Sequence, residues 1–286
     1  MNWQIVLILY FVVATASSLQ RRVFAQKTSL HPAVASLFSH AVIIFPLGIV
    51  WAIFEKNWFP NGVSTTLIIA MVVAALFQSL FNNFSLKSQK KIDATQFSII
   101  GNLYTPIAII GAAIYLHEGL TALQTVGMIL LVLGAVVVSV RGFSKKTLNF
   151  SKYSWLALLS ALVLGLAVIA ERSAIKGSSI GSYFVVGYAI QSVFQLIIAL
   201  PYLKKNFLYK KQETAGLIWM GVLRFGQFGT FALASVLANN VSLISSVTTF
   251  KIIFIFGASY FLLKEKDHLA RKIIGVVLSI AGLLLS

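Results

Sequence analysis

The chain consists largely of apolar segments that are each about as long as a membrane-crossing helix. An α-helix needs about 20 apolar residues to cross a bilayer. Ten segments have this character: 3–20, 31–54, 64–86, 94–115, 120–140, 153–173, 182–202, 214–237, 242–263 and 269–286. Of the 286 residues, 58% are hydrophobic and only 10% are charged, a composition typical of an integral membrane protein. We therefore predict an all-α fold of ten transmembrane helices that crosses the cell membrane repeatedly.

The two halves of the sequence repeat a pattern of acids and glycines. In each half an acid precedes two glycines, by nine and sixteen residues in the first half and by ten and seventeen in the second: Glu118, Gly127 and Gly134, then Glu265, Gly275 and Gly282. Asp93 and Asn240 each lie 25 residues before these acids, and Arg22 aligns with Arg172. Five spans in each half is an odd number, so the second half is predicted to be inserted upside down relative to the first.

This layout resembles the EamA branch of the drug/metabolite transporter superfamily, in which each half ends in a helix-turn-helix with a Glu followed by two glycines. The resemblance extends over essentially the whole chain. It implies two inverted five-helix repeats, residues 1–145 and 146–286, and an alternating-access mechanism. It also implies a central cavity lined mainly by helices 1, 3, 4, 6, 8 and 9, with helices 5 and 10 at the periphery. Glu265 lies in KEKDH, where the family more often has Gly-Glu, which leaves the form of this turn open.

The basic residues predict the orientation of the chain. Of 23 Lys and Arg, 18 lie in the loops that follow spans 1, 3, 5, 7 and 9. Because cytoplasmic loops carry an excess of Lys and Arg, these loops are predicted to be cytoplasmic and both termini to face outward. The net charge of +16 does not indicate a nucleic-acid partner, since no segment outside the spans is long enough to form a binding module.

Two cations lie within the predicted spans. Lys251 is nine residues from one end of segment 242–263 and twelve from the other, and its stem is too short to reach either interface easily. Arg224 lies ten residues inside segment 214–237. A charged side chain at the bilayer centre costs about 2.5 to 3.5 kcal/mol, so such residues usually face a cavity. We predict that both bind substrate; the alternatives are a lysine held by carbonyls or a buried carboxylate, and an arginine that extends along its helix to the interface.

Uncharged polar residues on the matching helices complete the predicted binding site. They are Gln78 and Asn82, four residues apart on one helix face, Asn102 and Tyr104 in the fourth span, and Thr248 near Lys251. Tyr104 occupies the repeat position of Lys251, and Pro106 is expected to leave the Asn102 carbonyl free toward the cavity. Each of these residues alone is more often an interhelical hydrogen-bonding group than a ligand, but as a set on the predicted cavity helices they favour a binding site.

Three further sites have open or structural interpretations. Glu171 is predicted to line the site as a counter-ion of Lys251 or Arg224, or else to pair with neighbouring Arg172 at a helix end. His40 is interpreted as a packing histidine. Arg21 and Arg22, at the end of the first span, are interpreted as interfacial anchors.

The leading hypothesis is a secondary transporter of a small metabolite, an exporter or exchanger. The first span has no Asp or Glu, which disfavours a lone cationic substrate. An excess of interior cations suits a carboxylate or phosphate group, as in an amino acid, an organic acid or a sugar phosphate. No GxxxxGK[ST] motif is present, so transport is expected to use a gradient or exchange.

Other functions fit the residues less well. The sequence has no cysteine and four isolated histidines, so we predict no enzyme activity, no cofactor and no metal site. The alternatives to a transporter are a channel, a non-transporting scaffold, or a flippase of lipid-linked phosphate. The expected partners are a small-molecule substrate and the lipid bilayer; whether the chain is a monomer or a homodimer is open.

Overall fold

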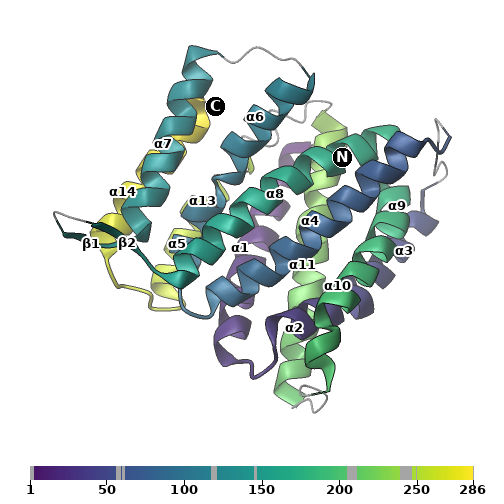
Figure 1. Cartoon of the computed structure of the whole chain (residues 1–286), viewed down its shortest axis with the longest axis horizontal. Helices are drawn as coiled ribbons and strands as arrows, with labels where there is room; N and C mark the ends of the chain where they lie inside the picture. The colour runs from purple at the N-terminus through teal and green to yellow at the C-terminus, as the bar shows by residue number, and fades with distance from the viewer. Residues whose placement is uncertain are drawn as a thin grey trace.

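The computed structural model describes residues 3–55, 59, 62–116, 121–144, 147–204, 211–238, 247–248 and 250–285, which fold mainly into helices (Figure 1). In the first half these are α1 (Trp3–Lys27), α2 (Pro32–Phe38), η1 (Ser39–Ile44), α3 (Phe45–Ile53), α4 (Thr65–Gln89), α5 (Ala94–Gly101), α6 (Tyr104–Leu116) and α7 (Ala122–Ser139). In the second half they are α8 (Lys152–Gly177), α9 (Ile180–Ser182), η2 (Tyr183–Gly187), α10 (Tyr188–Leu203), α11 (Lys211–Ala238), α13 (Lys251–Phe261) and α14 (Leu269–Leu285).

Seven helical segments of the described chain are long and apolar enough to cross a membrane: Trp3–Lys27, Pro32–Ile53, Thr65–Gln89, Ala122–Ser139, Lys152–Gly177, Ile180–Leu203 and Glu213–Ala234. The protein is therefore a multi-pass membrane protein, as predicted. The other three predicted spans contain shorter helices. α5 and α6 lie within 94–115, α13 within 242–263 and α14 within 269–286. The total of ten spans in an inverted repeat stays a prediction.

One short segment departs from the predicted all-α fold. Strands β1 (Val140–Ser144) and β2 (Thr147–Phe150) form an antiparallel hairpin in which Val140 pairs with Phe150 and Ser144 with Thr147. The prediction placed Val140 at the end of a span and the rest in a polar loop. Backbone N–H and C=O groups need hydrogen-bond partners. In the hairpin, the two strands supply these partners to each other. The predicted boundary between the halves, residues 145 and 146, lies outside the described residues.

Polar side chains fix where several of the helices begin. Ser64 Oγ accepts a hydrogen bond from the Leu67 N–H at the start of α4, at 3.1 Å. Asp93 Oδ1 accepts one from the Gln96 N–H at the start of α5, at 2.9 Å. Such N-caps satisfy backbone donors that have no partner within the helix.

The fourth predicted span is interrupted. α5 ends at Gly101 and α6 begins at Tyr104. Pro106 lies in the first turn of α6, where its missing N–H costs little, and a continuous helix would bring its ring against the carbonyl of Asn102. The expected free carbonyl is wrong, because Asn102 O accepts a hydrogen bond from the Thr105 N–H at 3.0 Å.

A second interruption occurs 147 residues later, at the matching repeat position. α13 begins at Lys251, after Phe250 in a turn. Lys251 is thus the first residue of a helix, which corrects its predicted place in the middle of a continuous one. The second and seventh spans also share an irregularity, since each contains a π-helical segment, η1 or η2. π-Helical turns are rare and occur frequently at functional sites.

Glycines bring α7 and α14 into close antiparallel contact at one edge of the bundle (Figure 1). A Cβ atom on Gly134 would lie 3.1 Å from the Gly275 carbonyl oxygen, and one on Gly282 would lie 2.7 Å from the Gly127 carbonyl oxygen. The paired residue numbers rise on one helix as they fall on the other, so the helices run in opposite directions. Small residues allow such close backbone approach between membrane helices.

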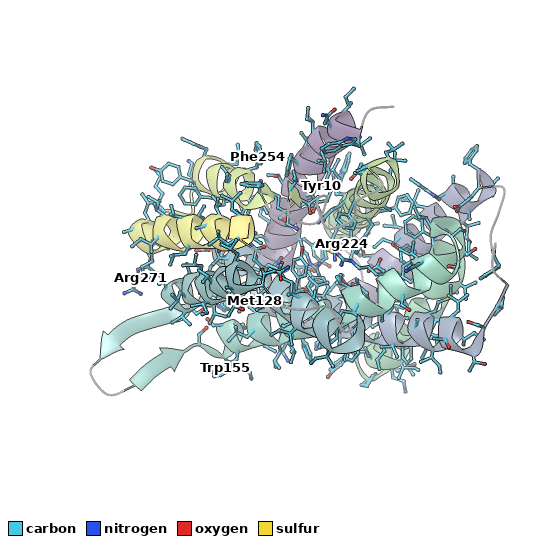
Figure 2. The ribbon with its side chains drawn as sticks, turned by 90° about the horizontal axis from the view of Figure 1, so that it is seen from above. Tyr10, Met128, Trp155, Arg224, Phe254 and Arg271 are labelled. Atoms are coloured by element: carbon cyan, nitrogen blue, oxygen red, sulfur yellow. The ribbon has the colours of Figure 1, made fainter. Side chains whose placement is uncertain are left out.

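The middle of the bundle is formed by two other helix pairs. α4 packs along α8, and α1 packs along α11 (Figure 1). Seen from above, Tyr10 and Arg224 lie in the interior, whereas Trp155 and Arg271 lie on the outside (Figure 2). The side chains between these pairs form the candidate site.

Candidate functional site

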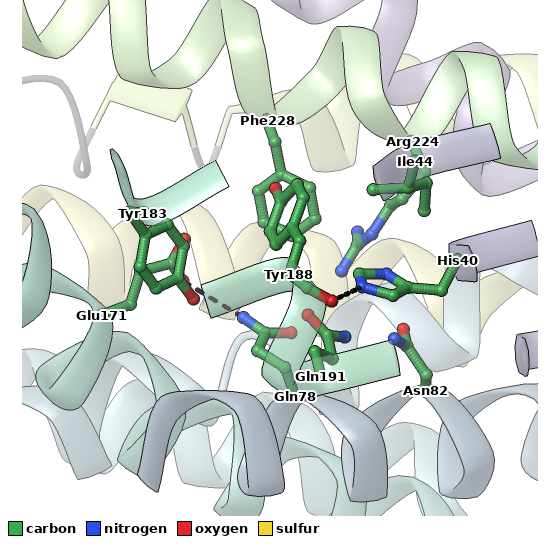
Figure 3. Close-up of a pocket in the computed structure, with 10 residues that line it drawn as sticks. All are labelled: His40, Ile44, Gln78, Asn82, Glu171, Tyr183, Tyr188, Gln191, Arg224 and Phe228. Atoms are coloured by element: carbon green, nitrogen blue, oxygen red, sulfur yellow. Dashed lines mark hydrogen bonds between the residues drawn. The ribbon is translucent and has the colours of Figure 1, made fainter. Parts of the chain in front are cut away.

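A small polar cavity lies between α4, α8, α11 and the two π-helical segments (Figure 3). Ten residues line it: His40, Ile44, Gln78, Asn82, Glu171, Tyr183, Tyr188, Gln191, Arg224 and Phe228. Its cavity volume is only about 10 Å³, whereas ligand pockets usually measure about 300 to 1,000 Å³, so in this conformation it has room for about one water molecule. Four of the predicted substrate-binding residues line it: Gln78, Asn82, Glu171 and Arg224.

Arg224 extends from α11 into this cavity (Figure 3). Its guanidinium carbon lies 4.4 Å from the centroid of the Phe228 ring, and its NH1 atom donates a 3.3 Å hydrogen bond to Gln227 Oε1. Its Nε atom is buried and has no hydrogen-bond partner. Within the described part of the chain, no carboxylate lies within 4 Å of this cation. A guanidinium has five N–H donors in a planar fork that fits a carboxylate or a phosphate, so Arg224 can bind such a group.

Glu171 occupies the other side of the cavity (Figure 3). Its Oε2 atom accepts a 3.1 Å hydrogen bond from Gln78 Nε2. Over the described residues, no ion pair within 4 Å joins Glu171 to Lys251 or to Arg224, but Glu171 and Arg224 interact electrostatically at longer range, so its role as a counter-ion stays a prediction. The cavity therefore has a cation on one side, an acid on the other, and the amides of Asn82 and Gln191 among its remaining lining groups.

His40 lines the cavity from η1 and is 2% exposed. Its Nε2 atom lies 3.2 Å from the backbone oxygen of Tyr188, and the two rings meet edge to face at 5.1 Å. Because a carbonyl can only accept, Nε2 carries the proton in this contact. The interpretation of His40 as a packing residue agrees with this contact, although the residue also borders the cavity.

Lys251 lies beside the cavity lining without forming part of it. Its Nζ atom donates a 3.2 Å hydrogen bond to the hydroxyl oxygen of Tyr10 and lies 5.9 Å from the centre of that ring. Tyr10 is 3% exposed on α1. Tyr104 and Arg224 are both close enough to Lys251 to interact with its charge. As the first residue of α13, Lys251 adds its charge to the positive end of a helix, which favours an anion nearby.

The other predicted residues lie at or next to the two helix interruptions. Asn102 is 2% exposed at the end of α5, and its Nδ2 atom has no hydrogen-bond partner. Tyr104 is the half-buried first residue of α6, and Thr248 is buried just before the second interruption. None of these three residues lines the cavity.

The cavity includes residues that the sequence analysis missed. Tyr183, Tyr188 and Gln191 come from η2 and α10, and Ile44 and Phe228 complete the wall. Aromatic residues in an apolar helix fit a packing surface as well as a binding site. The sequence signal that could have indicated a cavity on this side was Gln191, a polar residue within the seventh predicted span.

Comparisons with known proteins agree with the predicted family. Residues 3–140 match the model of the EamA-like transporter family, which belongs to the drug/metabolite transporter superfamily. The match covers slightly less than half of the chain and points to a membrane transporter of the drug/metabolite type. No curated protein matches the sequence.

Solved structures share the fold of this chain beyond the matched residues. One, titled "Crystal structure of protein", aligns with 100% of this chain and 96% of its own, with a TM-score of 0.61 and 10% sequence identity. At this identity the likeness shows the fold alone.

Ion pairs join several helices at one end of the bundle. Arg22 Nε lies 2.8 Å from Glu265 Oε1, and Lys272 Nζ lies 2.8 Å from Asp93 Oδ2. Arg22 NH1 also donates to the Gln89 carbonyl. We call this group, Arg22, Gln89, Asp93, Glu265 and Lys272, the ion-paired end. It joins α1, α4, α5, α14 and the loop before α14.

The position of Arg21 and Arg22 corrects their interpretation as interfacial anchors. They are 7% and 6% exposed, so both side chains are buried in the bundle. Anchors at a membrane interface would extend toward lipid headgroups, whereas Arg22 instead finds an acid that lies 243 positions away in the sequence.

The turn that carries Glu265 keeps the backbone form that glycine prefers. Lys264, directly before Glu265, has a φ of 57°, in the left-handed region where non-glycine residues are disfavoured. A Gly-Glu pair would fit here without strain. The KEKDH turn therefore differs from the common EamA sequence, but its backbone has the conformation that a glycine would adopt.

The opposite end of the bundle contains a wide hollow. A hollow of about 590 Å³ adjoins eight described residues: Trp51, Phe54, Glu55, Ile175, Ser178, Ser179, Ile180 and Leu233. We call this region the Glu55 end. The Glu55 carboxylate accepts a hydrogen bond from the Gly181 N–H, and Ser178 is 7% exposed.

Aromatic rings separate this hollow from the cavity. Trp51 borders the hollow and meets Phe184 at 5.7 Å and Phe225 at 6.3 Å between ring centroids. Phe184 in turn stacks on Tyr188, a cavity residue, at 5.0 Å. We call Trp51, Phe184 and Phe225 the aromatic layer.

Proposed function

We propose that the protein is a secondary transporter, an exporter or exchanger, of a small metabolite that bears a carboxylate or a phosphate. The observation that carries this proposal is Arg224, a half-buried arginine that lines the cavity, whose buried Nε–H donor is unused and which has no carboxylate within 4 Å among the described residues. An unpaired buried charge is costly. A substrate oxyanion would compensate it.

The groups around Arg224 support a small polar metabolite. Lys251 places a second cation within electrostatic reach of Arg224, and its bond to Tyr10 leaves the other two donors of its ammonium group for further partners. Glu171 and the cavity amides can accept from the ammonium of an amino acid or from the hydroxyls of an organic acid or a sugar phosphate.

Alternating access is supported by the difference between the two ends. The ion-paired end is joined by two salt bridges, whereas the Glu55 end has a hollow beside the aromatic layer, which packs against the cavity residue Tyr188. If the basic loops are cytoplasmic, the protein is closed toward the cytoplasm in this conformation. Because the cavity is smaller than most ligand pockets, substrate binding would require it to expand.

An inverted repeat of residues 1–145 and 146–286, inserted in the cell membrane, is part of this proposal. Helix interruptions at Tyr104 and Lys251, the two π-helical segments, and the antiparallel contact of α7 with α14 support it. Interrupted helices at matching positions of two repeats commonly mark the binding site of a transporter.

A binding screen tests the proposed substrate class. Purified protein in detergent would be heated in the presence of amino acids, organic acids, sugar phosphates and nucleotides, since a ligand that binds only the folded state raises the melting temperature. We expect at least one anionic compound to bind, and Arg224→Gln to weaken its binding about 10-fold or more, as the loss of a charged hydrogen-bond donor would.

Arg271→Gln is the matched control, because Arg271 lies on the outside of the bundle (Figure 2) and should not affect affinity. Uptake of the identified compound into proteoliposomes would then be measured for Arg224→Ala and Lys251→Ala, both of which should lose saturable transport. Normal transport by both folded variants would overturn the proposal, as would binding of cationic compounds alone.

A further inference from the structure

Arg21 is a second arginine with unused hydrogen-bonding capacity. It lies near the end of α1 and is 7% exposed. Its NH2 atom donates to the Asn82 backbone oxygen at 3.1 Å and to Ser85 Oγ at 2.5 Å. Its Nε atom is buried without a partner, and no acid among the residues that the structure describes lies within 4 Å. The side chain is therefore held in place by neutral groups while its charge stays uncompensated.

Arg21 and Arg224 share one neighbour, the ring of Phe81. Each guanidinium carbon lies 5.3 Å from the centroid of that ring, and the two charges are close enough to repel each other. Asn82, which lines the cavity, also accepts hydrogen bonds from Arg21 through its backbone oxygen and, at 3.5 Å, through Oδ1. Arg21 is thus separated from the cavity by a single residue.

Arg21 lies between the cavity and the ion-paired end. The next residue, Arg22, forms the salt bridge with Glu265 that helps to close that end. A group that moved from Arg224 toward the ion-paired end would pass Asn82 and Phe81 and meet Arg21 before any solvent-exposed cation of α1.

We propose that Arg21 is a second oxyanion-binding residue, which receives the carboxylate or phosphate of the substrate as it leaves Arg224 and the ion-paired end opens. This inference rests on the proposed function and adds a residue to it. The bound oxyanion would use the free edge of the guanidinium and reduce the repulsion between the two arginines. A purely structural arginine would instead be expected to have its buried donors satisfied.

The test uses inorganic phosphate as the probe and removes the salt bridge between Arg22, the next residue, and Glu265. Thermal unfolding would be followed over a phosphate titration, at constant ionic strength, for the wild type and for the double variant Arg22→Gln with Glu265→Gln. Replacing both partners leaves no unpaired charge. We expect the half-saturating phosphate concentration to fall roughly 10-fold in the double variant, because a larger fraction of the protein is open for binding.

Arg21→Lys in the same double variant is expected to reverse this gain, since lysine keeps the charge but loses the planar fork. Arg271→Gln in that background serves as the control and should change nothing. If Arg21→Lys binds phosphate as tightly as its parent, or if the double variant shows no gain, Arg21 is not a binding residue.

The outcome separates this inference from the proposed function. Loss of binding in Arg224→Gln together with an unchanged Arg21→Lys variant would retain the proposed function and overturn the inference alone. If phosphate binding is retained in both the Arg224→Gln and the Arg21→Lys variants, the proposed function and the inference are both overturned.

Discussion

At the ion-paired end, two partly buried salt bridges and the hydrogen bond from Arg22 to Gln89 connect α1, α4, α14 and the segments just before α5 and α14, whereas at the Glu55 end one carboxylate bonds a backbone N–H beside a hollow of about 590 Å³. The comparison applies to the residues that the structure describes. A closed end that depends on paired charges can be opened by separating a few side chains. An end closed by packed aromatic rings must instead expose apolar surface to open.

The largest expected effect comes from removing one charge of the ion-paired end. Glu265→Gln leaves Arg22 buried without an acid, and breaking a buried ion pair in this way costs about 3 to 5 kcal/mol of stability. The double variant Arg22→Gln with Glu265→Gln should cost clearly less, because no charge stays unpaired. Melting temperatures of the purified variants would measure this difference, and equal losses in the single and double variants would contradict it.

The same variants allow the opening of each end to be measured. Because the chain has no cysteine, one introduced at Ser88, which is 0% exposed near the ion-paired end, would report access there. Labelling of Ser88→Cys by a water-soluble maleimide should be slow in the wild type and faster in the double variant. Ile175→Cys at the hollow is the control. It should be labelled faster than Ser88→Cys in the wild-type background, and its labelling rate should not rise in the double variant. Equal rates at both sites in the wild type would contradict the comparison.

A smaller, stabilising effect is expected from Lys264→Gly. Lys264 is exposed and has a φ of 57°, a left-handed conformation that costs a non-glycine residue about 1 to 2 kcal/mol. Part of this gain is lost because glycine is more flexible in the unfolded chain, so a net gain of about 1 kcal/mol is expected. Lys266→Gly, in the same loop but without a positive φ, is the control. No rise in melting temperature relative to that control would show that the turn is unstrained.

The smallest effect should come from pH. His31, next to α2, has its pKa lowered by partial burial and then by Lys87 and Lys90, and its Nδ1 atom accepts a 3.3 Å hydrogen bond from the Ala33 N–H. Protonation removes that acceptor, so the contribution of His31 is present above its unfolded pKa, about 6.5, and is lost as pH falls through the lowered folded value. His31→Asn should cap the helix without this dependence. Identical melting curves of both proteins between pH 7 and 5 would contradict the assignment.

The helices and part of the site were predictable from the sequence because of the bilayer. Apolar runs of about 20 residues marked the spans, and polar residues within them had to face inward. That reasoning placed Gln78, Asn82, Glu171 and Arg224 together correctly. It could not distinguish Tyr183 or Tyr188 from ordinary packing residues, since aromatic rings serve both purposes.

Pairing over long sequence distances was the part that could not be predicted. Nothing local to Arg22 indicates that its partner is Glu265, so a basic pair at the end of a span was read as an anchor. Likewise, the interruption before Lys251 moved this residue from the middle of a helix to its start. The Pro106 ring signalled the equivalent interruption in the first half, but no proline lies near Lys251.

The glycine contacts between α7 and α14 limit how the protein can move. Backbones that approach so closely have no layer of side chains between them that could rearrange, so sliding one helix along the other would bring larger residues into the contact. This edge is expected to keep its packing unchanged and to lie on the axis about which the two halves rotate. Opening of the ion-paired end then requires the central pairs, α1 with α11 and α4 with α8, to swing about an axis that lies well away from the substrate.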